Sequence, residues 1–382
     1  MDEMREGHFS LMDCLDEIDD PRDASNGTLY DFQEMLVIAI CASLCDMETC
    51  ADFALWARAR ESWLRRFLRL KNGTPSSATF YRLFRALDPK QFEAFFRRWV
   101  GQIVPAAAQP GQIAIDGKTI RGSADGATRP AHIVSAFSTE LGIVFGQERV
   151  DQKSNEITAI PELLEALYVK GFLVSIDAMG CQKEIARKII DKGGDYLLMV
   201  KGNQPGLLSQ VGEAFVAEQR EALPRFEHVE KSHGRQVSQI TWTAPADLAA
   251  VDTREWPHCT TVAMVASLRQ VGDKTSELEQ RYYISSRALS PEAMAKAIRA
   301  HWAVENKLHW MLDVNFGEDA CTVKKDNAPE ILSLIRRVVL NMLSLDTTQP
   351  AFAKTKLSKR QKRKFANLEE SIMRSILGIQ PL

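Results

Sequence analysis

The pattern of apolar positions changes partway along the chain. The first hundred residues have helical spacing: residues 31–46 are strongly apolar, and residues 61–70 and 77–87 carry apolar side chains with arginines on the opposite face. The segment between the latter two, KNGTPSS, contains Gly and Pro and predicts a turn. These two helices are compatible with a helix-turn-helix and equally with an ordinary helical hairpin.

From Gly111 the spacing becomes that of strands. The pattern predicts strands over residues 112–116, 133–138, 142–147, 172–177 and 196–200, with helices over 161–169 and 182–192. Three strands joined by short turns predict an antiparallel meander, and the alternation that follows predicts parallel strand-helix-strand units. The order predicts an α/β fold with an RNase-H-like core, which is a mixed sheet flanked by helices.

A strand-rich insertion interrupts this core over about residues 207–286, where one helix precedes several alternating segments. Helical spacing returns from Pro291 to beyond Trp310 and again over residues 329–345. We therefore predict three parts. A helical, DNA-binding N-terminal domain covers residues 1–105, the RNase-H-like catalytic domain covers 106–345, and a basic C-terminal tail covers 346–382.

Charge is segregated along the chain, although the net charge is only −2. Residues 1–57 hold 14 acidic and 2 basic residues, whereas residues 58–98 hold 11 basic and 3 acidic residues. Residues 354–364 hold 7 basic residues and no acidic residue. Such blocks favour anionic partners, and solvated helix faces are the alternative explanation.

Several protein classes are excluded by composition. Hydrophobic residues make up 45% of the chain and charged residues 26%, the balance of a globular protein rather than a disordered or fibrous one. The longest apolar run is too short to cross a membrane, and no secretory signal is visible at the N-terminus. Seven scattered cysteines without a CxxC pair predict reduced thiols, buried in the case of Cys41 and Cys45. We expect a cytoplasmic, DNA-associated protein without a membrane partner.

Two aspartates follow apolar strands. Asp116 ends the first strand and Asp177 ends the fourth, and these strands are neighbours in an RNase-H-like sheet. A carboxylate in such a position is costly unless it faces a cleft, a metal or a strong partner, and two together favour a divalent cation such as Mg²⁺. Glu305, on a Trp-rich helix, is the best third carboxylate, and Glu318 and Asp319 are its rivals. Either aspartate alone could be a capped turn residue.

Other residues near these positions allow more than one interpretation. His301, Glu305 and His309 share one helical face, but they spread too far along it to chelate one ion readily. For His301 we favour a role in supporting the metal ligands or in binding DNA phosphate. Trp302 and Trp310 could stack on a displaced base, although core packing is favoured. A helix-capping role is favoured for Glu156. In the insertion, the sequence His233-Gly234-Arg235 could contact DNA.

Five ordered segments carry a resemblance to a known family: residues 114–123 (AIDGKTIRGS), 153–164 (KSNEITAIPELL), 176–182 (IDAMGCQ), 195–205 (DYLLMVKGNQP) and 301–320 (HWAVENKLHWMLDVNFGEDA). They resemble the ISAs1-family transposases, which include the H-repeat-associated proteins and belong to the IS4-like DDE superfamily. The resemblance covers almost the whole chain, from DCLDEIDDPRD onward. It implies an RNase-H-like core in which Asp116, Asp177 and Glu305 form the catalytic, metal-binding triad.

The resemblance also implies a reaction. A DDE transposase cleaves DNA at the ends of its own insertion element and joins the freed 3′-hydroxyl to target DNA. Two metal ions suit this chemistry, and we expect Mg²⁺, with Mn²⁺ able to substitute. The expected partners are the terminal inverted repeats, the target DNA and other copies of the chain. A decayed DNA-binding remnant and a metal-dependent nuclease without strand transfer are the alternatives.

The sequence departs from the IS4-like pattern around the final acid, where that pattern has Arg before the Glu and Lys after it. His301 stands in place of the Arg, and Leu312 stands in place of the Lys. The phosphate-positioning role of this Lys could pass to Lys307, Lys201 or Lys118. Lys118, Arg121 and Lys201 follow strand-end motifs and are candidates for binding DNA phosphates, although each could be an ordinary surface cation.

Overall fold

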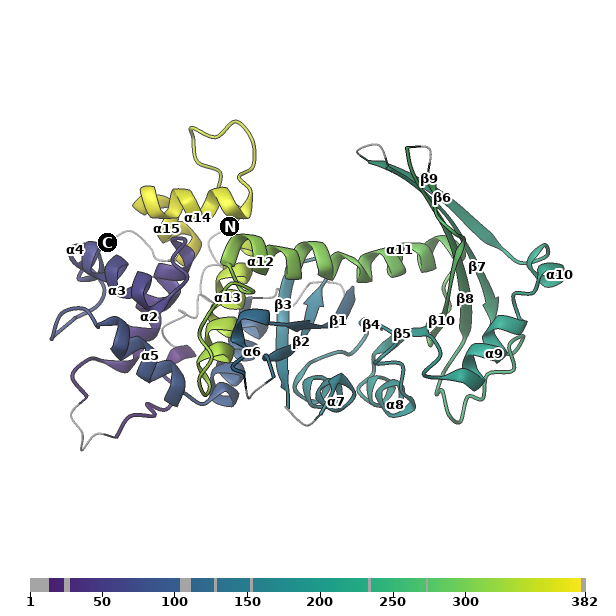
Figure 1. Ribbon diagram of the computed structural model, residues 1–382, viewed down its shortest axis with the longest axis horizontal. Coiled ribbons are helices and arrows are strands. Elements are labelled where there is room, and N and C mark those ends of the chain that lie inside the picture. Colours follow the sequence, from purple (N-terminus) through teal and green to yellow (C-terminus); the bar gives the residue numbers. More distant parts are fainter. Residues whose placement is uncertain are drawn as a thin grey trace, which may run out of the picture.

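The chain folds into three parts that lie in a row (Figure 1). The computed structural model describes residues 14–23, 28–103, 111–126, 129–151, 154–232, 235–272 and 274–378. Helices from both ends of the chain form one end of the molecule, a mixed sheet flanked by helices forms the centre, and a curved extension of the sheet forms the other end. The central sheet therefore connects the other two parts.

The sheet has the strand order of an RNase-H-like core. The described strands of this core are β1 (Gln112–Thr119), β2 (His132–Ser138), β3 (Ile143–Val150), β4 (Leu173–Ile176) and β5 (Asp195–Val200). They lie in the order β3-β2-β1-β4-β5. The first three are antiparallel neighbours, whereas β4 runs parallel to both β1 and β5. The predicted fold class is confirmed by this topology.

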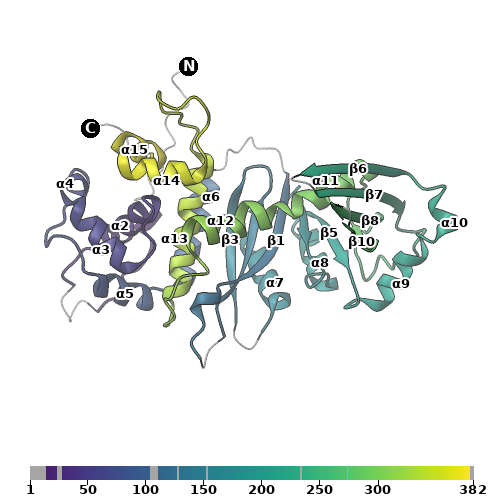
Figure 2. The same ribbon diagram turned by 45° about the horizontal axis from the view of Figure 1, so that its top comes forward.

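The insertion extends the same sheet instead of forming a separate one. Its described strands are β6 (Arg225–Ser232), β7 (Arg235–Pro245), β8 (Thr261–Val271), β9 (Lys274–Thr275) and β10 (Glu279–Ser285). β10 pairs with β5, and β8, β7 and β6 follow in turn. Two short helices, α9 (Pro205–Glu213) and α10 (Ala217–Arg220), precede these strands and lie at the outer end of the molecule (Figure 2).

Helices cover both faces of the central sheet. α7 (Glu156–Ala166) and α8 (Lys183–Asp191) lie on one face, and α11 (Pro291–His301) lies on the other face, against β1, β4 and β7. The predicted start of α7 was wrong. Asn155 caps the helix by accepting a hydrogen bond from the backbone of Ile157, so Pro161 lies inside the helix and not in its first turn.

The helical part begins with α2 (Phe32–Leu44), α3 (Cys50–Ala59), α4 (Glu61–Leu64), α5 (Ser77–Ala86) and α6 (Pro89–Ile103). Cys41 in α2 and Cys45, the residue that follows its last turn, are buried, as predicted. The helix expected over residues 61–70 ends at Leu64, and α5 packs against α3, with the rings of Phe53 and Phe80 6.0 Å apart. The helix-turn-helix interpretation of residues 61–87 is therefore wrong.

The C-terminal residues are helical and partly buried. α13 (Ala328–Leu345) packs against α2, α6 and β3, and it ties the helical part to the sheet. α14 (Lys359–Leu368) and α15 (Glu370–Leu377) then pack on α13. Buried Arg363 pairs with Asp46 at 2.9 Å, and buried Lys362 pairs with Asp346 at 2.6 Å. Part of the predicted basic tail is thus folded against the N-terminal helices.

Among the helices that the structure describes, none is long and apolar enough to cross a bilayer.

Candidate active site

The two predicted aspartates lie side by side in the sheet. The parallel pairing of β1 with β4 ends at Ile115 and Ile176, and Asp116 and Asp177 are the next residues on the two strands. β1 itself continues to Thr119 in its pairing with β2, so Asp116 does not end the strand as predicted. It lies where β1 loses its parallel neighbour, which opens space beside its carboxylate.

Glu305 reaches the same place from the helix that crosses the sheet. The helix that starts as α11 changes to π-helical geometry over the segment η3 (Glu305–His309) and continues as α12 (Trp310–Phe316). Single π turns inside α-helices occur frequently at functional sites. Carboxylate and imidazole atoms of Asp116, Glu305 and His309 all lie within 4.8 Å of one another.

His309 is the residue that sequence reasoning undervalued. Its Nδ1 lies 3.4 Å from an oxygen of Glu305 and 3.8 Å from an oxygen of Asp116. The side chain is buried, and its Nε2 has no hydrogen-bond partner among the described residues. The sequence signal for this contact was the i, i+4 spacing of His309 from Glu305. The π turn directs both side chains at Asp116.

The carboxylates influence one another. The pKa of Asp116 is raised to about 6: burial has the largest effect and the neighbouring Glu305 and Asp177 carboxylates add to it, whereas His309 and the hydrogen bond from the Gly117 backbone oppose it. Burial also raises the pKa of Asp177, and the carboxylate of Glu156 adds to this effect. The hydrogen bond from His309 lowers the pKa of Glu305. Because Glu305 and Asp177 disfavour the ionised form of Asp116, a cation bound among these carboxylates would stabilise that ionised form.

His301 has a buried structural environment. Its Nδ1 lies 3.1 Å from the hydroxyl of Ser175 on β4, and that hydroxyl also accepts a hydrogen bond of 2.7 Å from the Gln112 amide on β1. The same amide donates to the Ala297 carbonyl of α11 at 2.9 Å. Burial lowers the pKa of His301 to about 4, so the ring is neutral at pH 7. This network fixes α11 on the two strands that carry the aspartates.

Glu156 approaches the site from the opposite face of the sheet. It is the first residue of α7, whose capping residue is Asn155, and its carboxylate lies 2.6 Å from Nε2 of His132. Gly117 makes this approach possible, because a Cβ at this position would lie 2.7 Å from the carboxyl carbon of Glu156. A side chain larger than hydrogen at residue 117 would displace Glu156.

Lys118 differs most from its expected role. Its side chain is buried, and its ammonium group lies 2.7 Å from Asp313, 2.9 Å from Asp319 and 3.4 Å from Glu318. Glu318 is itself buried and pairs with Arg337 at 3.0 Å. The ion pairs of Lys118 therefore hold β1 against α12 and the loop that follows it. They contradict the predicted role of Lys118 as a phosphate ligand.

The other candidate cations are accessible. The side chain of Arg121 is 85% exposed, and its ion pair with Asp319 is long, at 3.6 Å. Lys201 follows β5, is exposed and lies near enough to Asp177 to lower the pKa of that carboxyl. Lys307 is exposed on the π turn, two residues after Glu305.

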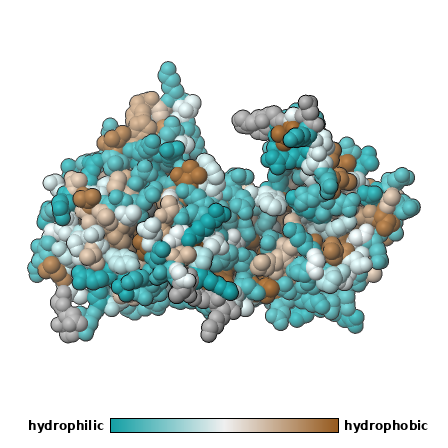
Figure 3. All heavy atoms as spheres, in the orientation of Figure 1, coloured by the Kyte–Doolittle hydropathy of each residue, from teal (hydrophilic) through white to brown (hydrophobic). Residues whose placement is uncertain are grey.

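Trp302 and Trp310 are exposed, at 44% and 53%, so the expectation of core packing was wrong for both. They lie before and after the π turn on the helix that crosses the sheet. Figure 3 shows that the outline of the molecule dips between two projections, and Figure 1 shows this helix crossing below the dip. The candidate site is therefore carried by a helix at the base of an open concave surface.

An RNase-H-like sheet with carboxylates beside its central parallel strands defines a class of metal-dependent enzymes that act on phosphodiesters. Within that class, residues 107–342 match the family model described as "Transposase DDE domain", and residues 12–100 match the one described as "DDE_Tnp_1-associated". The chain belongs to this family of DDE transposases. Family membership implies DNA as the partner and a divalent metal as the cofactor.

Curated relatives agree with this assignment. The chain is 37% identical over 360 residues to the H repeat-associated protein YhhI of Escherichia coli K12, covering 91% of this chain and 93% of that protein. It is 40% identical over 341 residues to YncI of Escherichia coli O157:H7, covering 87% of each. The names of both proteins class them with the transposases. The resemblance to H-repeat-associated transposases is thus confirmed.

Among solved structures, the chain is similar to a piggyBac transposase in a synaptic complex with hairpin DNA, with a TM-score of 0.46 and 12% identity. The match covers 94% of this chain and 75% of that chain.

Proposed function

We propose that this protein is an active transposase that cuts DNA at the ends of an insertion element and joins the freed ends to a target. The observation that carries the proposal is the arrangement of Asp116, Asp177 and Glu305: the two aspartates follow paired residues of β1 and β4, and Glu305 comes within 4.8 Å of Asp116 from the π turn. Burial opposes the ionisation of both aspartates, so two such carboxylates at neighbouring positions carry a free-energy cost that a bound cation would remove.

The donor set fits a divalent cation. Carboxylate oxygens are the ligands that Mg²⁺ and Mn²⁺ prefer, and Asp116, Asp177 and Glu305 are the residues that would hold two such ions when DNA is bound. Bound ions would activate a water or a 3′-hydroxyl and neutralise charge on the phosphate under attack. His309 contacts Glu305 at 3.4 Å and acts as a positioning residue that directs this carboxylate toward Asp116.

The reaction has two phosphoryl-transfer steps at one site, a hydrolysis followed by a transesterification. In the first, a water oxygen bonds to phosphorus and the bond to the 3′-oxygen breaks, which leaves a 3′-hydroxyl. In the second, that hydroxyl attacks a phosphodiester of the target and displaces its 3′-oxygen. Lys201, which acts on the pKa of Asp177, and the exposed Arg121 and Lys307 are the accessible cations that would hold the phosphates beside the reacting bond.

The test uses purified protein, labelled DNA that carries the element's ends, and Mg²⁺ or Mn²⁺, with nicked and joined products scored separately. We expect both products from the wild type. Asp116→Asn, Asp177→Asn and Glu305→Gln should each lower the yield of both products by at least about 100-fold, because each removes a metal-binding charge. Asp191→Asn, at the exposed end of α8, is the matched control and should retain activity.

Two other outcomes would overturn the proposal. Nicked products without joined products would identify a nuclease, and DNA binding without either product would identify a decayed remnant. Sedimentation of the complex with and without end DNA tests the further expectation that copies of the chain assemble on DNA.

A further inference from the structure

A large pocket lies on the insertion, away from the carboxylates. Its volume is about 710 Å³, and it is enclosed by α11 and by the faces of β7, β8 and β10 that look toward this helix. Its polar lining is dominated by arginines from four elements: Arg235 of β7, Arg269 of β8, Arg281 of β10 and Arg299 of α11.

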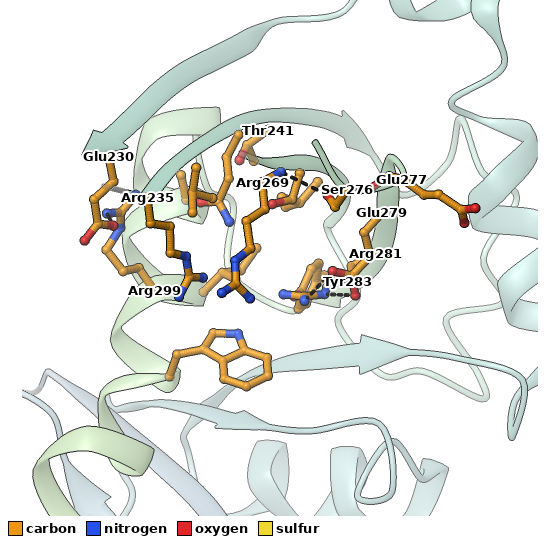
Figure 4. Close-up of a pocket in the computed structure, with 17 residues that line it drawn as sticks. Glu230, Arg235, Thr241, Arg269, Ser276, Glu277, Glu279, Arg281, Tyr283 and Arg299 are labelled. Atoms are coloured by element: carbon orange, nitrogen blue, oxygen red, sulfur yellow. Dashed lines mark hydrogen bonds and ion pairs between the residues drawn. The ribbon is translucent and has the colours of Figure 1, made fainter. Parts of the chain in front are cut away.

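Two of these arginines already have acidic partners. Arg281 makes two hydrogen bonds, of 2.8 and 2.7 Å, to the carboxylate of Glu279, and Arg299 lies 3.1 Å from Glu230. The remaining acidic residue of the lining, Glu277, points away from the pocket in Figure 4. The pocket therefore retains more positive than negative charge.

Arg235 and Arg269 lack such partners. Both side chains point into the pocket and toward each other (Figure 4). Among the described residues, neither guanidinium group has an ion pair or a hydrogen bond; His233 and Gly234, which precede Arg235, lie outside the described part. Two like charges that face each other repel, and an anion between them would remove that repulsion. The planar guanidinium group matches a phosphate with two parallel hydrogen bonds.

One helix connects the pocket with the candidate active site. Ala295, Ile298, Arg299 and Trp302 line it at the spacing of a single helical face, and Glu305 follows three residues later. A helix rises about 1.5 Å per residue, so Arg299 and Glu305 are about 9 Å apart along the axis. A DNA strand advances about 3.4 Å per nucleotide, so this distance corresponds to about three nucleotides.

We propose that this pocket binds the backbone phosphates of a DNA strand, about two to four nucleotides from the bond presented to Asp116 and Glu305. Arg235 and Arg269 hold the phosphates, and the pocket sets the position of the strand relative to the carboxylates. The inference rests on the proposed function, because that function supplies the DNA strand.

The test measures the affinity of the full chain for a labelled duplex carrying the element's end, at several salt concentrations and without a divalent cation. The double variant Arg235→Ala/Arg269→Ala should bind about 10-fold or more weakly. The slope of log K against log salt should become shallower by about 1.4 to 1.8, since each phosphate that the protein neutralises contributes about 0.7 to 0.9 to the slope. Arg235→Lys/Arg269→Lys should recover most of the slope, because it keeps the charges.

Arg254→Ala is the matched control, because the side chain of Arg254 is 89% exposed in the same insertion and pairs with Asp252 outside the pocket. Equal melting temperatures of all variants exclude unfolding as the cause. Ethylation interference on the duplex locates the phosphates that are bound: modified phosphates two to four nucleotides from the cut should weaken binding by the wild type and not by the double variant.

An unchanged salt slope in the double variant would overturn the inference. A free-phosphate site would also overturn it. That outcome would appear as inorganic phosphate raising the melting temperature of the wild type but not of the double variant, with DNA affinity unchanged. The proposed function fails separately: a wild type that binds DNA through this pocket and never cuts it would leave the pocket's role intact.

Discussion

Glu93, a carboxyl remote from the active site, shows how one buried residue links stability to pH. It lies on α6 with a side chain that is 1% exposed, and one of its oxygens has no hydrogen-bond partner among the described residues. Burial raises its pKa to about 8, and the carboxylates of Glu148 and Glu330 add to this effect. The folded chain therefore holds this proton more tightly than the unfolded chain does.

We predict that this carboxyl makes the protein less stable as pH rises. Because its folded pKa is above its unfolded value, its stabilising effect is complete below about pH 4.5 and is lost as pH approaches 8. The free energy of unfolding should fall by at most about 1.4 kcal/mol per pH unit through this group. Urea unfolding of Glu93→Gln at pH 5 to 8 should show a flatter profile than the wild type. Glu61→Gln, an exposed control, should keep the wild-type profile, and parallel profiles for Glu93→Gln would contradict the prediction.

At the scale of single residues, the sequence predicted the carboxylates better than the groups around them. Asp116 and Asp177 could be found because a charge after an apolar strand is costly and therefore informative. His309 could not be ranked, because its contact with Asp116 depends on a π turn that periodicity does not reveal. The role of Lys118 was predicted wrongly because the carboxylates that neutralise it, Asp313 and Glu318, lie about 200 positions away in the sequence. Nothing close to Lys118 in the sequence indicated these partners.

Among the elements, the contact between β1 and α12 holds the strand that carries Asp116. Lys118 is buried among three carboxylates, and one of these, Glu318, is buried completely and pairs with Arg337. The charges of Arg337, Arg336 and Lys118 lower the pKa of Glu318 to about 2 against the opposing effect of burial. The strand and the helix are thus joined by a network of buried charges.

We predict that Lys118→Met lowers the free energy of unfolding by about 3 kcal/mol, because it leaves carboxylates close together without their cation. Chemical denaturation at pH 7 measures the effect. Lys296→Met is the matched control: Lys296 forms an exposed i,i+4 pair with Glu292 on α11, and its removal should cost less than about 0.5 kcal/mol. If both variants were destabilised by the same small amount, the network would not stabilise the fold.

The strengths and errors of the element predictions have physical causes. Strands buried on the sheet, such as β1, β4 and β5, have runs of apolar residues, and they were found in the correct order. β6 was missed because its sequence RFEHVEKS is mainly polar and lies at the exposed edge of the sheet. The helix predicted over residues 61–70 has apolar residues at helical spacing, but the observed helix ends at Leu64. Leu68 and Leu70 are buried although they lie outside a helix.

In the whole molecule, folding brings one of the segregated basic segments, residues 354–364, close to the turn that carries Glu305. The pKa of Lys359 on α14 is lowered to about 8, mainly by burial. The charge of Lys307 on the π turn adds to this effect, and so do the charges of Lys362 and Lys356. The basic segment near the C-terminus therefore lies close to the turn that carries Glu305. Clustered cations of this kind favour a phosphate backbone, which would restore the charge of Lys359 at neutral pH.

We predict that this cluster contributes to the salt dependence of DNA binding. Deleting the segment would remove Lys362 and Arg363, which are buried in the fold, so the test neutralises the half-buried Lys359 and its exposed neighbours Lys356 and Arg360 instead. The triple variant Lys356→Gln/Lys359→Gln/Arg360→Gln should bind end DNA more weakly. Its slope of log K against log salt should become shallower by up to about 0.9 for each phosphate that the variant no longer neutralises.

The control for this triple variant lies on the opposite face of the sheet, where Lys170→Gln/Lys188→Gln/Lys192→Gln changes the net charge by the same amount near α8. A general effect of net charge would weaken binding equally in both variants, whereas local binding of a phosphate would be weakened only in the first.

A parallel variant, Arg58→Gln/Arg69→Gln/Lys71→Gln, tests whether the basic block of the N-terminal helices also binds DNA. If neither block changed the affinity or the salt slope, the charge segregation in the sequence would reflect solvated surfaces, and the DNA would be bound by the core and insertion alone.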